Sequence, residues 1–438
     1  MVLNILIFSI LLLLLFFRYK EGVILITVLS PWLFMWKFPV GQTLNLYVAL
    51  SCVAIILLLR NEQLKYSRNF PFIWTIIFPF ISFSVTAVFV KFKIVPLLEL
   101  LSSYIFPFAL FSVIREKEDI NLFLKYLSIF LLFVVSYTFI EELTSSNPIM
   151  DWCVRHKQQF GWIASTNQYR FGIKRAQSFL LYCSALGGLC NYSFFIIAYL
   201  RSKNVEFTKT PLFTFLLYAL PLCTFLTGTR SVIIAFIIIC ICFINYNIVR
   251  RYKFTLLFIA TIAFFMFQPY LSKIGNSIIA SDDVNNRIGS SVEMRETQFA
   301  VATYYMLRAK SPWYGNGLDF TDKVKQDNWE ILGAESIWLP RMIDQGYIGV
   351  ICLAISYVIM LLILIKYKMY ACFWVMLSFI FGKTVSAMLG MVEGYYLLVF
   401  VIIYRYLQIT HHLPSNLLDK RTMLKKLFNR NKLKETLQ

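Results

Sequence analysis

Long apolar blocks follow one another along most of this chain, and short polar or basic connections separate them. A helix that spans the hydrocarbon core of a bilayer needs about 20 mostly apolar residues, and most of the blocks reach or approach that length. The pattern therefore predicts an all-α polytopic membrane protein with about 12–14 transmembrane helices. The blocks lie near residues 2–17, 22–39, 43–59, 70–90, 94–114, 121–140, 177–200, 211–228, 231–249, 254–271, 347–365, 370–389 and 394–408.

One long polar run, residues 273–344, interrupts this pattern. Within it, Ser290 and Glu293 have the spacing of a capping box, which predicts that a helix begins there and runs over 294–310. Pro312 and the glycines behind it end that helix in a turn. We expect the helix to be amphipathic and to lie along the membrane surface. Its expected face consists of Arg295, Phe299, Ala302 and Met306.

The polar run divides the chain into four predicted regions. Residues 1–272 hold transmembrane helices 1–10, with a smaller extracytoplasmic loop near 141–175. Residues 273–344 form a large extracytoplasmic loop and the expected active-site region, although any ordered loop outside the membrane can be polar and rich in tryptophan. Residues 345–408 hold the last three transmembrane helices, and 409–438 form a basic cytoplasmic tail.

Charged residues are scarce and unbalanced: 59% of the chain is hydrophobic, 15% is charged, and the net charge is +19. The basic residues cluster in short connections and in the tail after Arg405, where the positive-inside rule expects topology signals, so nucleic-acid binding is not expected. The tail places the C-terminus in the cytoplasm. Counting back along the spans places residues 141–175, the turn before Arg230, the long polar run and the turn around Glu393 on the opposite side.

Cysteine and histidine usage argues against disulfide and metal chemistry. All but Cys153 of the nine cysteines lie in apolar blocks, and the three histidines, His156, His411 and His412, are scattered. A metal site needs ligands at a convergent spacing, which this sequence lacks. No metal or other cofactor is therefore expected.

Arginines on the extracytoplasmic side need an explanation other than the charge rule. Arg175 precedes a span, and Arg230 lies in a tight turn between two spans. A guanidinium stays charged and binds phosphate oxygens through paired hydrogen bonds, so arginines that converge here would hold a diphosphate. The simpler alternatives are pairing with carboxylates of the loop or, for Arg230, snorkelling to the membrane interface.

Four short motifs, in chain order, together resemble the O-antigen polymerase and O-antigen ligase superfamily over roughly residues 175–349. They are Arg175 ahead of a span, Thr227-Gly228-Thr229-Arg230-Ser231 after a span, Arg295 with Phe299 and Ala302 followed by Pro312-Trp313-Tyr314-Gly315-Asn316-Gly317, and Glu335-Ser336 with Gly346 and Gly349 downstream. The ligase branch is expected to carry a histidine at the start of the fourth motif. This chain has Glu335 there, and its long polar run contains no histidine. The resemblance therefore favours the polymerase branch.

The resemblance implies a glycosyltransferase of lipopolysaccharide biosynthesis in the bacterial inner membrane. It would join oligosaccharide repeat units carried on undecaprenyl diphosphate at the periplasmic face, without a metal, because arginines neutralise the leaving group. The lipid bilayer and the lipid-linked oligosaccharide are the expected partners, and a chain-length regulator and a flippase are further candidates. The alternatives are an O-antigen ligase that transfers glycan to the lipid A core, and a polysaccharide flippase or transporter.

On this interpretation the catalytic residues are Glu335, as general base or acceptor-orienting group, and Arg175 and Arg230, which hold the diphosphate. The candidate substrate-binding residues are Arg295, Arg341, Arg287, Tyr314 and Trp338. Glu335 could instead favour the start of the next helix or pair with Arg341, and Asp344, one turn further on, is expected to be the partner of that arginine. Interfacial anchoring is the simpler role for the aromatic side chains.

Overall fold

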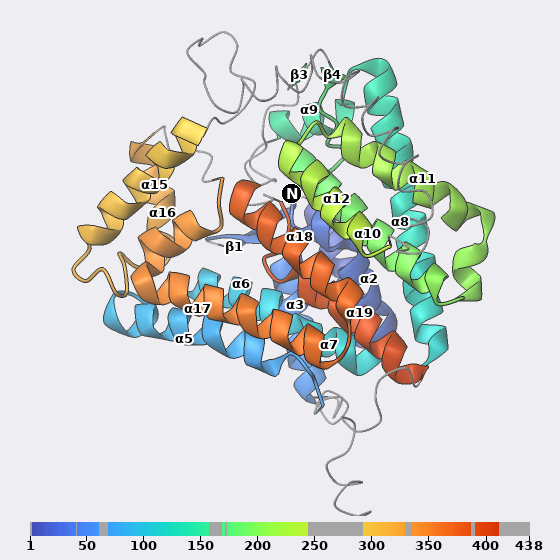
Figure 1. Ribbon diagram of the computed structural model, residues 1–438, viewed down its shortest axis with the longest axis horizontal. Coiled ribbons are helices and arrows are strands. Elements are labelled where there is room, and N and C mark those ends of the chain that lie inside the picture. Colours follow the sequence, from blue (N-terminus) through green and yellow to red (C-terminus); the bar gives the residue numbers. More distant parts are fainter. Residues whose placement is uncertain are drawn as a thin grey trace, which may run out of the picture.

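The computed structural model describes residues 2–40, 42–60, 69–156, 169–170, 173–243, 292–328, 335–386 and 390–410, and these are almost entirely helical (Figure 1). The helices are α1 (Val2–Phe17), α2 (Tyr19–Leu33), α3 (Leu46–Arg60), α5 (Ile73–Phe89), α6 (Ile94–Tyr104), α7 (Phe106–Val113), α8 (Lys117–Thr144), α9 (Pro148–Arg155), α10 (Cys183–Ser202), the 3₁₀ helix η2 (Glu206–Lys209), α11 (Pro211–Leu226), α12 (Arg230–Ile241), α15 (Val292–Leu307), α16 (Phe320–Asp327), α17 (Trp338–Lys366), α18 (Tyr370–Ser386) and α19 (Tyr395–Ile409). Two short antiparallel hairpins pair β1 (Lys37–Val40) with β2 (Gln42–Asn45) and β3 (Tyr169–Arg170) with β4 (Ile173–Lys174).

Most of the predicted apolar blocks overlap these helices, although the end of the block at 22–39 forms β1 and the block at 94–114 is divided between α6 and α7. The block at 254–271 and the end of the block at 231–249 lie outside the described residues. Within the described part of the chain, four stretches are long and apolar enough to cross a membrane: Ile94–Val113, Lys117–Thr144, Cys183–Ser202 and Trp338–Lys366. Shorter apolar helices accompany them. The chain is therefore an all-α membrane protein.

Contacts between connections sort the helix ends into two groups. At one end, which we call the loop end, Arg175 donates to Thr229 and Arg341 pairs with Glu393. At the opposite end, Lys20 pairs with Asp119 at 2.6 Å, and the Tyr406 hydroxyl donates to the Lys203 carbonyl at 3.2 Å. This is the grouping that alternating membrane crossings require. All the candidate site residues with described side chains belong to segments at the loop end.

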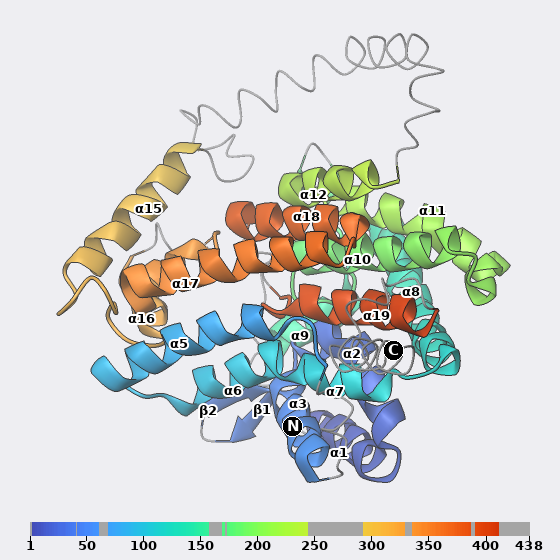
Figure 2. The same cartoon turned by 60° about the horizontal axis from the view of Figure 1, so that its bottom comes forward.

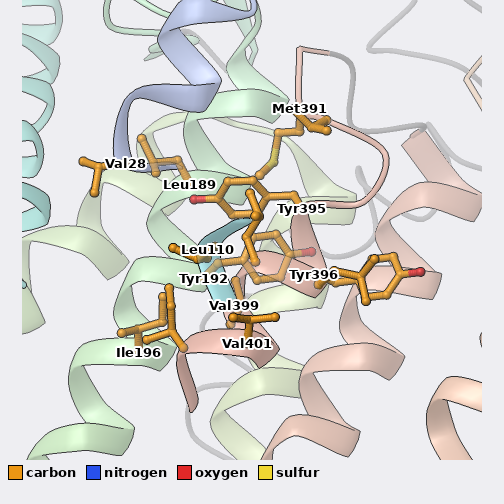
Figure 3. Close-up of a cluster of buried hydrophobic side chains, with 14 of the residues drawn as sticks. Val28, Leu110, Leu189, Tyr192, Ile196, Met391, Tyr395, Tyr396, Val399 and Val401 are labelled. Atoms are coloured by element: carbon orange, nitrogen blue, oxygen red, sulfur yellow. The ribbon is translucent and has the colours of Figure 1, made fainter. Parts of the chain in front are cut away.

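The helix α19 runs through the centre of the bundle. Nearly all its side chains are apolar and buried against other helices. Its Tyr395 packs against Tyr192 of α10 with ring centroids 5.6 Å apart, and its Tyr396 lies 4.7 Å from Phe379 of α18. Figure 3 shows Tyr395 beside Tyr192 in this core, with the Tyr396 ring pointing the other way. Around it, α17 lies along α5 and α18 lies along α12 (Figures 1 and 2). The central helix therefore fixes the turn before it, which carries Glu393.

The helices α15 and α16 pack on the first turns of α17 and lie to one side of the main bundle (Figure 2). They form a small second core of Ala302, Val324, Leu339 and Ile343. The helix predicted at 294–310 is confirmed as α15, but its predicted face is only half right. Ala302 and Met306 are buried, whereas Phe299 is 38% exposed and Gln298 is buried in its place. The capping-box residue Ser290 lies outside the described residues, as does the side chain of Glu293.

Candidate functional site

Arg175 binds the turn that carries Arg230. Its Nε donates to the Thr227 carbonyl oxygen at 3.2 Å, and its Nη2 donates to the Thr229 hydroxyl at 2.9 Å. The backbone N–H of Ala176 adds a hydrogen bond to the Leu226 carbonyl at 3.0 Å. Two of the motifs found in the sequence, separated by a whole pair of helices, therefore dock directly on each other.

A buried ion pair beneath Arg175 explains why this segment holds its position. Lys174 lies 3.5 Å from Glu141 at the end of α8, and the two side chains are 1% and 0% exposed. The other oxygen of Glu141 accepts hydrogen bonds from the backbone N–H groups of Gln177 and Ser178, at 3.1 and 2.7 Å. Buried charges are tolerated only when they are paired and hydrogen-bonded, so this carboxylate clamps the chain on both sides of Arg175.

Arg230 is the first residue of α12 and is half-buried. It lies within electrostatic range of Arg295, Glu335 and Arg175. A cation at a helix N-terminus is disfavoured by the helix dipole, and neighbouring guanidinium groups add to the positive potential. Such a position favours an anion, because the positive end of the helix dipole and the nearby guanidinium groups carry the same sign of charge.

The carboxylate of Glu335 lies beside this group of arginines. Arg295, on α15, approaches it to 3.5 Å, and the two side chains are 31% and 33% exposed. The pairing with Arg341 that the sequence suggested as an alternative is wrong, because Arg341 binds a different carboxylate. We call Arg175, Arg230, Arg295 and Glu335 the arginine cluster; its three guanidinium groups and one carboxylate leave an excess of positive charge.

Arg341 lies in the first turn of α17 and pairs with Glu393, whose carboxylate also accepts from the Tyr104 hydroxyl at 2.9 Å. Burial raises the pKa of the Glu393 carboxyl, but the charge and hydrogen bonds of Arg341 and the hydrogen bond from Tyr104 outweigh burial and hold the pKa below its ordinary value. The predicted pairing of Arg341 with Asp344 is wrong. It accepts instead from the backbone N–H and the hydroxyl of Thr321, both at 2.7 Å, and so fixes the start of α16.

The motif around Gly315 packs against a kink in α17. The backbone of Gly346 has φ 62° and ψ −152°, which interrupts the helix. The N–H of Tyr347 donates to the Pro312 carbonyl at 3.0 Å, and the N–H of Gly317 donates to the Asp344 carbonyl at 3.0 Å. A Cβ atom on Gly346 would lie 2.1 Å from the Pro312 carbonyl oxygen, so only glycine fits there. This motif therefore orients the start of α17.

The remaining predicted site residues either contact other side chains of the protein or lie outside the described residues. Tyr314 stacks on Phe89 of α5 with centroids 5.0 Å apart, and the Trp338 indole donates to the Thr384 hydroxyl at 3.0 Å. Arg287 lies outside the described residues. Sequence reasoning missed Glu141 and Lys174 as supports of the site, because no local pattern shows which carboxylate a lysine will meet across the bundle.

The arginine cluster has the chemical character of an anion site with an adjacent carboxylate. Guanidinium groups bind phosphate oxygens and stabilise charge that develops on a leaving group, and Glu335 can accept a proton. Within the described residues, no group of three or more His, Cys, Asp or Glu side chains is arranged to hold a metal ion. No protein-family model and no curated protein matches this chain.

Proposed function

We propose that this chain is a membrane glycosyltransferase of the O-antigen polymerase type. It joins oligosaccharide repeat units carried on undecaprenyl diphosphate, at the periplasmic face of a bacterial inner membrane. The observation that carries the proposal is the convergence of Arg175, Arg230 and Arg295, from three separate segments, with Glu335 at one end of a bundle of apolar helices. An anion site at the end of such helices suits a diphosphate whose lipid tail stays in the bilayer.

The arginine cluster binds the diphosphate of the donor substrate. Arg175 is held by the turn before Arg230, which keeps the two guanidinium groups close together without help from substrate. Bringing like charges together has an electrostatic cost, which a bound diphosphate would relieve. Of the further arginines considered from the sequence, Arg287 lies outside the described residues, and Arg295 is a better third ligand than Arg341, which pairs with Glu393 at 2.6 Å.

The transfer step breaks one bond and forms one. A hydroxyl oxygen of the acceptor repeat unit attacks the anomeric carbon of the donor, and the bond from that carbon to the diphosphate oxygen breaks. The diphosphate leaves with the bonding electron pair, and the arginines stabilise its growing negative charge. Glu335 takes the proton of the attacking hydroxyl. The Arg295–Glu335 contact is long, at 3.5 Å, so a bound diphosphate can draw Arg295 away and release Glu335 for this role.

The test compares variants in cells that lack the gene, with the level of each variant in the membrane measured alongside. Arg175→Ala, Arg230→Ala and Glu335→Gln are the test variants. Arg201→Ala is the matched control, because Arg201 donates to Thr214 on α11, away from the cluster. We expect the control to restore the ladder of surface polysaccharide, and each test variant to leave single repeat units on the lipid core.

Three other outcomes overturn the proposal in distinguishable ways. A normal ladder from all test variants assigns the arginine cluster a structural role. A core with no glycan at all, in cells without the gene, indicates a ligase or a flippase. Accumulation of the lipid-linked repeat unit on the cytoplasmic side separates the flippase from the ligase.

A further inference from the structure

A cavity of about 360 Å³ lies at the loop end, apart from the side chains of the arginine cluster. Its walls come from α5, α6, α16, the first turns of α17 and the turn before α19. Phe83 and Leu318 give it apolar surface, and Glu99, Asp319, Arg341 and Glu393 give it polar surface. Ligand sites have this size and this mixture of apolar wall and few polar groups.

The charged groups of the wall are mostly satisfied by one another. Glu393 is paired with Arg341 at 2.6 Å, and Asp322 is paired with Lys325 at 3.2 Å. Asp319 is paired with Lys93 at 3.5 Å, and Asp344 accepts three hydrogen bonds from the start of α16. Each of these carboxylates therefore already has a partner that belongs to the protein.

Glu99 differs from the other carboxylates of the wall. Within the described part of the chain, its carboxylate has no ion pair or hydrogen bond, although it lines the cavity. The side chain is surrounded by protein atoms on most sides, yet it keeps exposed surface and lines the cavity. A carboxylate in this position has hydrogen-bonding capacity directed at whatever fills the cavity.

The balance of charge restricts the ligand. The wall carries five acidic side chains, Glu99, Asp319, Asp322, Asp344 and Glu393, against the two basic side chains Arg341 and Lys325. This excess of acidic groups disfavours a phosphate or an acidic sugar, which would meet like charge. The hydroxyl or amino groups of a ligand would donate hydrogen bonds to the Glu99 carboxylate. The C–H faces of the same ligand would pack on Phe83 and Leu318.

We propose that this cavity binds a non-acidic sugar of the acceptor oligosaccharide, with Glu99 accepting hydrogen bonds from its hydroxyl or amino groups. The acceptor role rests on the proposed glycosyltransferase function. The chain itself links the two sites: Ile337 lines the cavity and lies two residues after Glu335. A sugar held here would therefore have its neighbouring residues close to the general base.

The wall around this sugar is closely packed, and a wall that is organised in advance favours selective binding. A Cβ atom on Gly394 would lie 2.0 Å from the Ser103 carbonyl oxygen, so the turn that carries Glu393 packs directly on α6. Tyr104, from the same helix, donates to Glu393 at 2.9 Å. The carboxylate of Glu393 and the helix that carries Glu99 thus hold their positions before any ligand binds.

The test uses purified full-length protein in lipid nanodiscs and a probe that carries no diphosphate. The probe is the free repeat-unit oligosaccharide, prepared by depolymerising the polysaccharide of the host, and binding is followed by saturation-transfer NMR titration. We expect wild type and Arg230→Ala to bind it equally, because Arg230 holds the diphosphate of the donor and the probe carries no diphosphate. Glu99→Ala should weaken binding about ten-fold or more, the usual effect of losing hydrogen bonds to a charged group.

Glu206→Gln is the matched control, because it changes an exposed carboxylate of η2 and should leave binding unchanged. Glu99→Gln should bind with intermediate affinity, and it decides the matter if Glu99→Ala does not fold. Equal binding by wild type and both Glu99 variants overturns the cavity assignment, and so does the absence of binding to wild type. The titration measures binding alone, whereas the glycosyltransferase proposal is tested by the polysaccharide ladder of the arginine variants. Failure of one proposal can therefore be distinguished from failure of the other.

Discussion

The Nη2 atom of Arg341 donates to both carboxylate oxygens of Glu393, each at 2.6 Å. The two side chains are 15% and 25% exposed. The pair joins the first turn of α17 to the turn before α19 and forms one wall of the cavity that contains Glu99. It therefore couples the central helix of the bundle to the segment that carries Glu335.

Removing both partners of this pair should destabilise the protein by less than the sum of the two single changes. A single Arg341→Met or Glu393→Gln change leaves a largely buried charge or polar group without its partner. We expect each to lower the free energy of unfolding by about 2–4 kcal/mol, somewhat less than the roughly 3–5 kcal/mol of a fully buried pair.

The measurement is the unfolding temperature of each variant purified in detergent. Lys310→Ala is the control, because Lys310 is exposed just beyond α15. Strict additivity of the two single changes would show that the pair does not couple α17 to α19.

The stability that this pair provides should depend on pH in a definite direction. Because Arg341 holds the pKa of Glu393 below its ordinary value, the folded protein favours the ionised carboxyl. This contribution is fully present above the pKa of the unfolded state, about 4.3, and is lost as the pH falls through the lower pKa of the folded state. The difference in unfolding temperature between wild type and Glu393→Gln should be constant near neutral pH and shrink in acid. A difference that grows in acid would contradict this assignment.

The helices could be predicted from the sequence because the bilayer requires long apolar runs, and these are visible in the order of residues alone. The pairings at the loop end could not. Arg341 meets Glu393, 52 residues away, and Arg295 meets Glu335, 40 residues away. The nearer Asp344 was predicted as a partner from helical spacing, but it is used by the backbone of α16. Local spacing shows which groups are neighbours on one helix, whereas the packing of helices decides which charges meet.

Gly346→Ala tests the contact between the Gly315 motif and α17. The added Cβ would lie 2.1 Å from the Pro312 carbonyl, and the positive φ of 62° disfavours any side chain. We expect a much lower level of folded protein in the membrane and a shortened polysaccharide ladder. The control is Ile351→Ala, on the exposed face of the same helix, which removes apolar surface without a backbone clash. A normal level of Gly346→Ala protein would mean that the motif does not fix the kink.

Changes at Arg295 and Glu335 should separate catalysis from stability. This pair is about one-third exposed on each side and 3.5 Å apart, so it contributes only about 0–1 kcal/mol to folding. Glu335→Gln and Arg295→Ala should therefore unfold within a few degrees of wild type, unlike changes at Arg341 and Glu393. If Glu335 takes the proton of the acceptor and Arg295 supports the diphosphate, both variants should nevertheless fail to extend the glycan, and binding of the free oligosaccharide should persist. A variant of Glu335 that is stable, binds the oligosaccharide and still polymerises would remove this carboxylate from the mechanism and leave the arginines as its chemical centre.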